Sequence, residues 1–271
     1  MSLSLPRPLT VVGVALATTL TLAIAGPILT VILWAFAEQW RYPNLIPTAW
    51  GLRFWGQMLG RADIIEAITT SFSLAFVATS IAAVICWPAA YAFARLKFPF
   101  RQPLLLAFLA ANAFPKFPLY IAIALILYRF GLVGTYGGVV LVQLLAALLY
   151  MIWIPTSAFR AIPPALEEAA FDLGASRLRV FLEITVPQAL PALAASYILS
   201  FVAILFEVDG ALIVGSPTIT TMPVKMLALA NDVVVQRAAV LCVLIWVPIF
   251  ILLLLSRRLL SGRAVAAGLG A

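Results

Sequence analysis

The sequence contains no histidine, only two cysteines and few charged residues. Without histidine the chain has no His-ligated metal site, no Ser-His-Asp triad and no histidine general base. Charged residues make up 10% of the 271 residues, against about 25% in an average soluble domain. Hydrophobic residues make up 65%, and the mean hydropathy is +1.13. This composition excludes an ordinary soluble globular protein, a disordered chain and a disulfide-stapled secreted domain.

Sequence features of enzyme and cofactor sites are also missing. The two cysteines, Cys86 and Cys242, lie inside apolar runs, which is typical of small buried hydrophobic residues. The chain has neither a Gly-x-Ser-x-Gly nucleophile elbow nor a Gly-x-x-x-x-Gly-Lys-Ser/Thr phosphate loop. We therefore expect no enzymatic activity, no metal site and no cofactor bound by the chain itself.

Long, continuous apolar segments dominate what is present. At about 20 apolar residues per crossing, they predict an all-α integral membrane protein with six transmembrane helices in a single domain, residues 1–271. Gly26-Pro27 predicts an interruption and a kink in the first span, and Pro115 and Pro118 predict breaks in the third. The predicted spans are residues 9–36, 68–94, 104–127, 136–154, 189–214 and 238–255.

The distribution of basic residues predicts the orientation. The net charge is +7, and in a membrane protein such a surplus is typical of cytoplasmic loops rather than of nucleic-acid binding. With the N-terminus inside, ten of the 17 Lys and Arg residues lie in cytoplasmic segments, six lie opposite and Lys116 lies within a span. This bias favours a topology with both termini in the cytoplasm. Aromatic residues near span ends, such as Tyr91, and the tryptophans of the loop 38–66 are expected at the membrane interface.

A long polar loop, residues 155–187, separates the fourth and fifth spans. Within it, residues 164–173 have the pattern of a short amphipathic helix. Pro164 fits the helix start, Glu167 and Glu168 favour its positive N-terminal end, and Gly174 fits its stop. A second short helix is expected over 177–184, after which Pro187 restarts the chain as a membrane helix.

The spacing within this loop is specific. Glu168-Ala169-Ala170 is followed after three residues by Gly174, and after nine more by Ile184-Thr185-Val186-Pro187. This pattern resembles the "EAA" loop in the membrane subunits of bacterial binding-protein-dependent ABC importers, with Val186 in place of the family's leucine. Small residues at Ala169 and Ala170 suit docking into a groove on another protein.

The resemblance implies a permease subunit of an ABC importer in the bacterial inner membrane. Its partners would be a second permease subunit, homologous or identical, two ATPase subunits that hold ATP and Mg²⁺, and an external solute-binding protein. The loop would be the coupling loop that docks on the ATPase. The residues implied in this coupling are Glu167, Glu168, Ala169, Ala170 and Gly174.

The likeness to particular sub-families is mixed. The coupling loop and residues 214–224 resemble permeases for polyamines, iron or aminophosphonates, whereas Pro118-Leu119-Tyr120 and residues 131–136 resemble the maltose type. We expect a small polar solute, with a polyamine- or aminophosphonate-like one favoured and a sugar as the alternative. A secondary transporter or channel that works without ATP is a more remote alternative.

Three ionisable residues, Lys116, Glu207 and Asp209, lie deep in predicted spans. A charge there costs about 2.5–3.5 kcal/mol on insertion scales, so it is normally paired or faces a cavity. Asn112 and Tyr120 lie at i−4 and i+4 from Lys116 and share its helix face. These five residues are the candidates for the solute pathway. A structural ion pair, such as Lys116 with Glu207, is the alternative interpretation.

Overall fold

The structure is a computed structural model that describes residues 7–41, 43–232 and 234–260, and it describes side chains there except at 7–11, 111–112 and 255–260. Apart from one short strand pair, the regular elements of the described residues are helices. Among the residues that the structure describes, five helices are long and apolar enough to cross a membrane. They cover residues 12–36, 62–95, 136–161, 177–205 and 235–254. The prediction of an all-α integral membrane fold is confirmed.

The chain divides into two compact units, which we describe separately. The hairpin unit comprises Met1–Ile64 and Met226–Val247. Its elements are α1 (Arg7–Phe36), β1 (Ala37–Gln39), β2 (Ala49–Trp50), α2 (Arg53–Leu59), the first residues of α3 (Ala62–Arg95), most of α10 (Met222–Ala230) and the first half of α11 (Val235–Leu260).

The hairpin unit shows what the tryptophan-rich loop forms. The interruption predicted at Gly26-Pro27 is wrong, because helix α1 runs through Pro27 to Phe36. Helix α1 leads directly into β1, which pairs antiparallel with β2. The Trp55 indole donates a hydrogen bond to the Ala35 carbonyl (2.8 Å). The rings of Trp34 and Trp40 stack with centroids 4.9 Å apart. These contacts fold the loop back onto the end of α1.

The core unit comprises Ile65–Lys225 and Pro248–Ala271. Its elements are the rest of α3, α4 (Arg101–Ala113), α5 (Lys116–Arg129), α6 (Tyr136–Ala161), α7 (Pro164–Asp172), α8 (Arg177–Val180), the π-helical turn η1 (Phe181–Thr185), α9 (Val186–Leu205), the π-helical turn η2 (Ala211–Gly215), the start of α10 and the end of α11.

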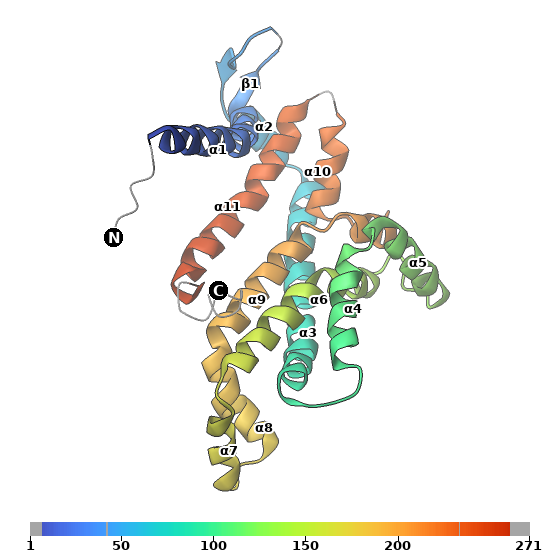
Figure 1. Ribbon diagram of the computed structural model, residues 1–271. Helices are drawn as coiled ribbons and strands as arrows, with labels where there is room; N and C mark the ends of the chain where they lie inside the picture. The colour runs from blue at the N-terminus through green and yellow to red at the C-terminus, as the bar shows by residue number, and fades with distance from the viewer. Residues whose placement is uncertain (1–6, 42, 233, 261–271) are drawn as a thin grey trace. The chain divides into compact units, whose positions relative to one another are not determined.

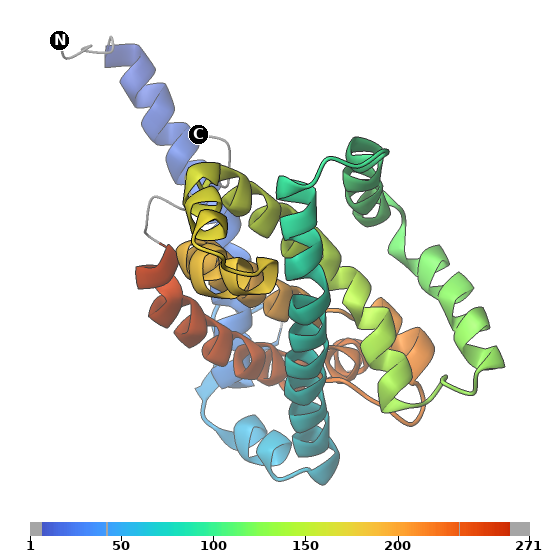
Figure 2. The ribbon, with the colours of Figure 1, turned by 90° about the horizontal axis from the view of Figure 1, so that it is seen from below.

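Helices α6 and α9 lie side by side in the core unit (Figures 1 and 2). One buried cluster joins the ends of α3, α6 and α9, and it includes Ala90, Phe159, Ala189, Ala192 and Leu193. The alanines let the helix backbones approach closely around the fully buried Phe159 ring. Such packing stabilises helix pairs in membranes, where van der Waals contact replaces the exclusion of water as the driving force.

The predicted third span consists of two helices in the structure, α4 and α5 (Figure 1). The break at Pro115 is confirmed, because this residue has an extended backbone (φ −55°, ψ 117°) and precedes α5. The break predicted at Pro118 is wrong. Pro118 lies in the first turn of α5, where the missing N–H has no intrahelical partner to lose. With 13 and 14 residues, each helix is shorter than the roughly 20 residues of a full crossing.

The boundaries of the fourth and fifth spans also differ from the prediction. Helix α6 continues through Pro155 to Ala161. The restart predicted at Pro187 is wrong, because the helix from Arg177 runs through this proline to Leu205. The π-helical turn η1 precedes Pro187, and the Val186 N–H bonds back to the Phe181 carbonyl five residues earlier. This wider turn accommodates a residue that has no N–H to donate.

Candidate functional site

The coupling loop folds around α7. This helix begins at Pro164, as predicted, and ends in a left-handed turn at Gly174 with φ +82°. The Ala175 N–H donates to the Ala170 carbonyl (3.0 Å) and the Gly174 N–H donates to the Phe171 carbonyl (2.8 Å). This pair of bonds is a Schellman motif, and a side chain at its left-handed position is strained. Gly174 therefore sets where α7 ends.

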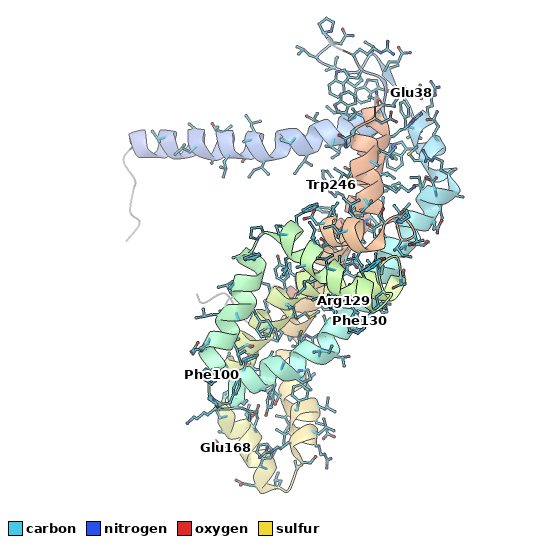
Figure 3. All side chains as sticks on the ribbon, turned by 90° about the vertical axis from the view of Figure 1, so that its right-hand side faces the viewer. Glu38, Phe100, Arg129, Phe130, Glu168 and Trp246 are labelled. Carbon is cyan, nitrogen blue, oxygen red and sulfur yellow. The ribbon has the colours of Figure 1, made fainter. Side chains whose placement is uncertain are left out.

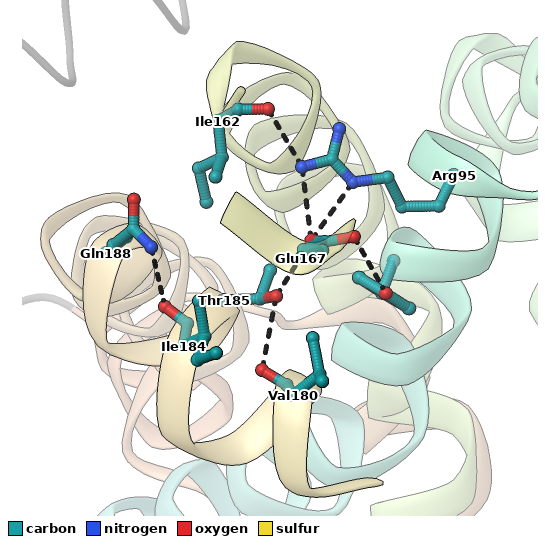
Figure 4. Close-up of polar contacts among 8 residues, drawn as sticks. Arg95, Ile162, Glu167, Val180, Ile184, Thr185 and Gln188 are labelled. Carbon is teal, nitrogen blue, oxygen red and sulfur yellow. Dashed lines mark hydrogen bonds and ion pairs between the residues drawn. The ribbon is translucent and has the colours of Figure 1, made fainter. Parts of the chain in front are cut away.

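Glu167 lies on the inner face of α7, and its carboxylate is the centre of a polar cluster (Figure 4). Its side chain is 7% exposed and forms an ion pair with Arg95 at the end of α3 (3.1 Å). The Tyr91 hydroxyl donates to Oε2 (3.1 Å), and the Thr185 hydroxyl donates to Oε1 (2.8 Å). Both carboxylate oxygens are thus bound by side chains from α3 and η1.

Arg95 extends this cluster to the start of the loop. Its guanidinium donates to Glu167 through Nε (3.1 Å) and to the Ile162 carbonyl through a terminal nitrogen (2.8 Å). One ion pair therefore joins the end of α3, the junction of α6 with α7, and α7 itself, while Thr185 adds the helix that leads into α9. We call Tyr91, Arg95, Glu167 and Thr185 the anchor cluster.

The outer face of the loop is exposed. Glu168 projects outward from the middle of α7 (Figure 3), and Ala169 and Gly174 are also exposed. Ala170 is buried and lines a cavity of about 280 Å³ between α7 and residues 179–184. Five large apolar side chains are exposed on this loop: Leu166, Phe171, Leu173, Leu178 and Leu182. Several exposed apolar side chains on one short loop are typical of a protein interface.

The sequence placed Glu167 and Glu168 in one group, but the structure gives them opposite surroundings. Glu168 faces outward and Glu167 faces the protein. Sequence reasoning missed the partners of Glu167. It counted Arg95 only among the basic residues that set the membrane orientation, and it placed Tyr91 at the membrane interface. The one relevant sequence signal is that Glu167 and Glu168 are adjacent. Neighbouring residues on a helix point about 100° apart, so the two side chains face different surroundings.

The charged residues at predicted membrane depth lie outside the regular part of the fifth span. Helix α9 ends at Leu205, and Glu207 follows it in a short break. Glu207 is 6% exposed, and its carboxylate accepts hydrogen bonds from the N–H groups of Gly210 (2.9 Å) and Ala211 (3.2 Å). Glu207 thus caps the helical turns that begin there.

The structure brings part of the predicted solute-pathway set together around this cap. Tyr120 is fully buried, and its hydroxyl interacts with the Glu207 carboxylate. Asp209 and Lys116 act on Glu207 electrostatically, but within the described side chains Lys116 makes no ion pair within 4.0 Å. The Asn112 side chain lies outside the described residues. No three His, Cys, Asp or Glu side chains of the described chain gather into a metal site.

Membrane-crossing helices and an anchored loop helix with an exposed outer face define a membrane subunit that can dock on another protein. The chain belongs to the family of binding-protein-dependent transport system inner membrane components, which matches residues 82–265. It is a multi-pass membrane protein and a permease of an ABC importer, so the predicted family and class of function are confirmed.

Named relatives agree with this assignment. The chain is 31% identical over 171 residues to the putative ABC transporter permease protein ORF1 of Streptomyces antibioticus, covering 63% of this chain and 75% of the relative. It is 32% identical over 212 residues to the trehalose transport system permease protein SugB of Mycobacterium tuberculosis, covering 74% and 76%. It is 28% identical over 269 residues to the maltose/maltodextrin permease MalG of Vibrio vulnificus, covering 90% of each chain.

A solved structure shares the fold. A chain of a bacterial ABC transporter that imports the acidic polysaccharide alginate superposes with a TM-score of 0.73, covering 95% of this chain and 98% of that one. The sequence identity is 16%. The likeness therefore concerns the helix arrangement.

Proposed function

We propose that the chain forms one share of the translocation pathway of a bacterial importer and pairs with a second permease subunit. Two ATPase subunits that hold ATP and Mg²⁺ would dock on the coupling loop, and an external binding protein would deliver the solute. The observation that carries this proposal is the loop itself. It exposes Glu168, Ala169 and Gly174 to a partner and is anchored to the membrane helices through Glu167.

The anchor cluster explains how motion of the ATPase would reach the pore. ATP-driven closure would push on the outer face of α7. Because Glu167 binds Arg95 and Tyr91 of α3 and Thr185 of the α9 helix, a push on α7 would move these helix ends together. A bistable helix arrangement would then change between inward- and outward-facing states.

The proposed topology has both termini in the cytoplasm. Reporter fusions after Arg101 and Arg263 are expected to be cytoplasmic, and fusions near Arg53 and Asn231 external, because of the bias in basic residues. Alkaline phosphatase and green fluorescent protein fusions at each position measure the sides directly. Opposite sides for the N-terminus and Arg263 would require an odd number of crossings and would contradict the arrangement.

Two solute classes follow from different observations. Glu207 and Asp209 beside the buried Tyr120 would suit a cationic solute such as a polyamine, and with Lys116 the set would suit a zwitterion such as an aminophosphonate. A sugar is the second candidate, because two relatives are named for trehalose and maltodextrin transport. The backbone bonds of the Glu207 carboxylate also give this residue a structural role that needs no cation.

Uptake by Glu207→Gln separates these classes. If the solute is a polyamine, spermidine uptake should fall about tenfold or more, since an attractive charge in a buried, low-dielectric environment is lost. If it is a sugar, maltose or trehalose uptake should change much less. Proteoliposomes with all subunits, with and without ATP, measure both, and Glu66→Gln is an exposed control. Uptake that does not require ATP would overturn the importer mechanism itself.

A further inference from the structure

A cavity in the hairpin unit lies outside everything assigned so far. It has a volume of about 750 Å³ and is lined mainly by polar and aromatic side chains of the β1–β2 hairpin, α2 and the start of α11. Glu38, labelled in Figure 3, marks its place on the hairpin. We call it the hairpin pocket. The six lining residues that matter below are Trp34, Trp40, Arg41, Arg53, Gln57 and Arg237.

The charge of the hairpin pocket favours an anion. Three arginines and one acid, Glu38, line it. Within the described residues neither Arg41 nor Arg53 makes an ion pair, whereas Arg237 binds Asp232 (3.2 Å). Glu38 accepts a hydrogen bond from the Arg53 backbone N–H (3.3 Å). Two guanidinium groups are therefore left to bind a carboxylate or phosphate, and a polyamine would be repelled.

Two residues of the lining also carry polar atoms that lack a hydrogen-bond partner. Gln57 Oε1 and Arg237 Nε have no hydrogen-bond partner in the described structure, although both are buried. The first is an acceptor and requires a donor, and the second is a donor and requires an acceptor. A hydroxyl group supplies both, whereas the ammonium groups of a polyamine supply only donors.

The aromatic wall of the pocket fits a ring. Trp34 and Trp40 stack with an interplanar angle of 28°, and Trp40 is fixed by a hydrogen bond from its indole to the Asn44 carbonyl (2.9 Å). A rigid aromatic surface beside a few placed polar groups is the usual construction of a small-molecule site. The arginines, the unpartnered polar atoms and the aromatic surface of the pocket therefore favour the same class of ligand.

We propose that the hairpin pocket binds an acidic saccharide, meaning a hydroxylated ring that bears a carboxylate or phosphate. The pocket lies at the end of α1 away from the N-terminus, which is the external side in the proposed topology. If the solute of the importer is a saccharide, the pocket would be a first site where this solute meets the permease before the pathway. The solute role rests on the proposed importer function, whereas ligand binding itself can be measured without transport.

The test measures binding to the complete transporter in nanodiscs of neutral phosphatidylcholine, without ATP or binding protein. Isothermal titration with glucuronate, methyl glucoside and spermidine should give binding for glucuronate, at least about tenfold weaker binding for the neutral sugar and none for spermidine. Arg53→Gln and Arg41→Gln should each weaken glucuronate binding about tenfold. Arg129→Gln, an exposed arginine outside the pocket, should leave it unchanged.

Other outcomes overturn the proposal in recognisable ways. Equal affinity in the wild type and in Arg41→Gln/Arg53→Gln would exclude the pocket as the site. If phosphatidylglycerol added to the nanodiscs binds in an Arg53-dependent manner and glucuronate does not, the pocket holds a lipid headgroup. If the arginine variants weaken only the docking of the binding protein, the pocket is a protein contact. Failure of the importer function would appear separately, as uptake that is independent of ATP.

Discussion

Glu167→Gln is expected to lower the solute transported per ATP hydrolysed by about tenfold or more, while ATPase subunits still bind. The substitution keeps oxygen and nitrogen atoms near Tyr91 and Thr185, but it leaves the Arg95 guanidinium, whose side chain is 13% exposed, without its counter-charge. Breaking a buried ion pair in this way costs about 3–5 kcal/mol. Because the pair holds α7 to α3, ATP-driven motion of α7 would no longer move the helix ends. Parallel assays of uptake and ATP hydrolysis in proteoliposomes measure the ratio.

The same loop provides a matched control. Arg179 and Glu183 form an ion pair of 2.9 Å, but both side chains are more than 60% exposed. Exposed pairs contribute only about 0–1 kcal/mol, so Glu183→Gln should change the transport ratio less than about twofold. Glu167→Asp, which keeps the charge, should recover part of the lost ratio. Equal effects of Glu167→Gln and Glu183→Gln would show that the anchor cluster has no special part in coupling.

Glu168→Lys is expected to abolish ATP-driven uptake with the permease still present in the membrane. Glu168 is exposed and faces outward, so reversing its charge leaves the fold of α7 intact. At a docked interface, an unfavourable charge contact costs several kcal/mol, which amounts to a hundredfold loss or more. Uptake and the amount of ATPase that co-purifies measure the effect.

A second charge reversal controls for general damage. Glu66 is also exposed but lies far along the chain from the loop, so Glu66→Lys should retain uptake. Normal uptake together with normal ATPase binding by Glu168→Lys would refute the assignment of the outer face of α7 as the docking surface.

The coupling helix could be predicted from sequence because its signals are local. Pro164 fixes the start of α7, and Gly174 supplies the left-handed residue that ends it. The sequence also predicts a membrane protein, since long apolar runs require lipid. These features depend on residues within a few positions of one another.

The rest depends on contacts between distant segments. Arg95 and Glu167 are 72 positions apart, and nothing in either neighbourhood indicates the pairing. The end of α9 at Leu205 could not be read from composition, because apolar residues continue beyond it. There Glu207 caps a new helical turn through Gly210. A Cβ at Gly210 would lie 2.7 Å from Val142 Cγ1 and 3.0 Å from the Glu207 carboxylate, so the close packing around this turn favours glycine.

The central claim is that the coupling loop docks an ATPase that drives transport. Affinity purification of the tagged chain from native membranes, followed by mass spectrometry, tests it most directly. We expect an ATPase subunit with a phosphate-binding loop to co-purify in about equal amount with the wild-type chain and to be lost with Glu168→Lys. A wild-type chain that carries solute without any associated ATPase would contradict the account.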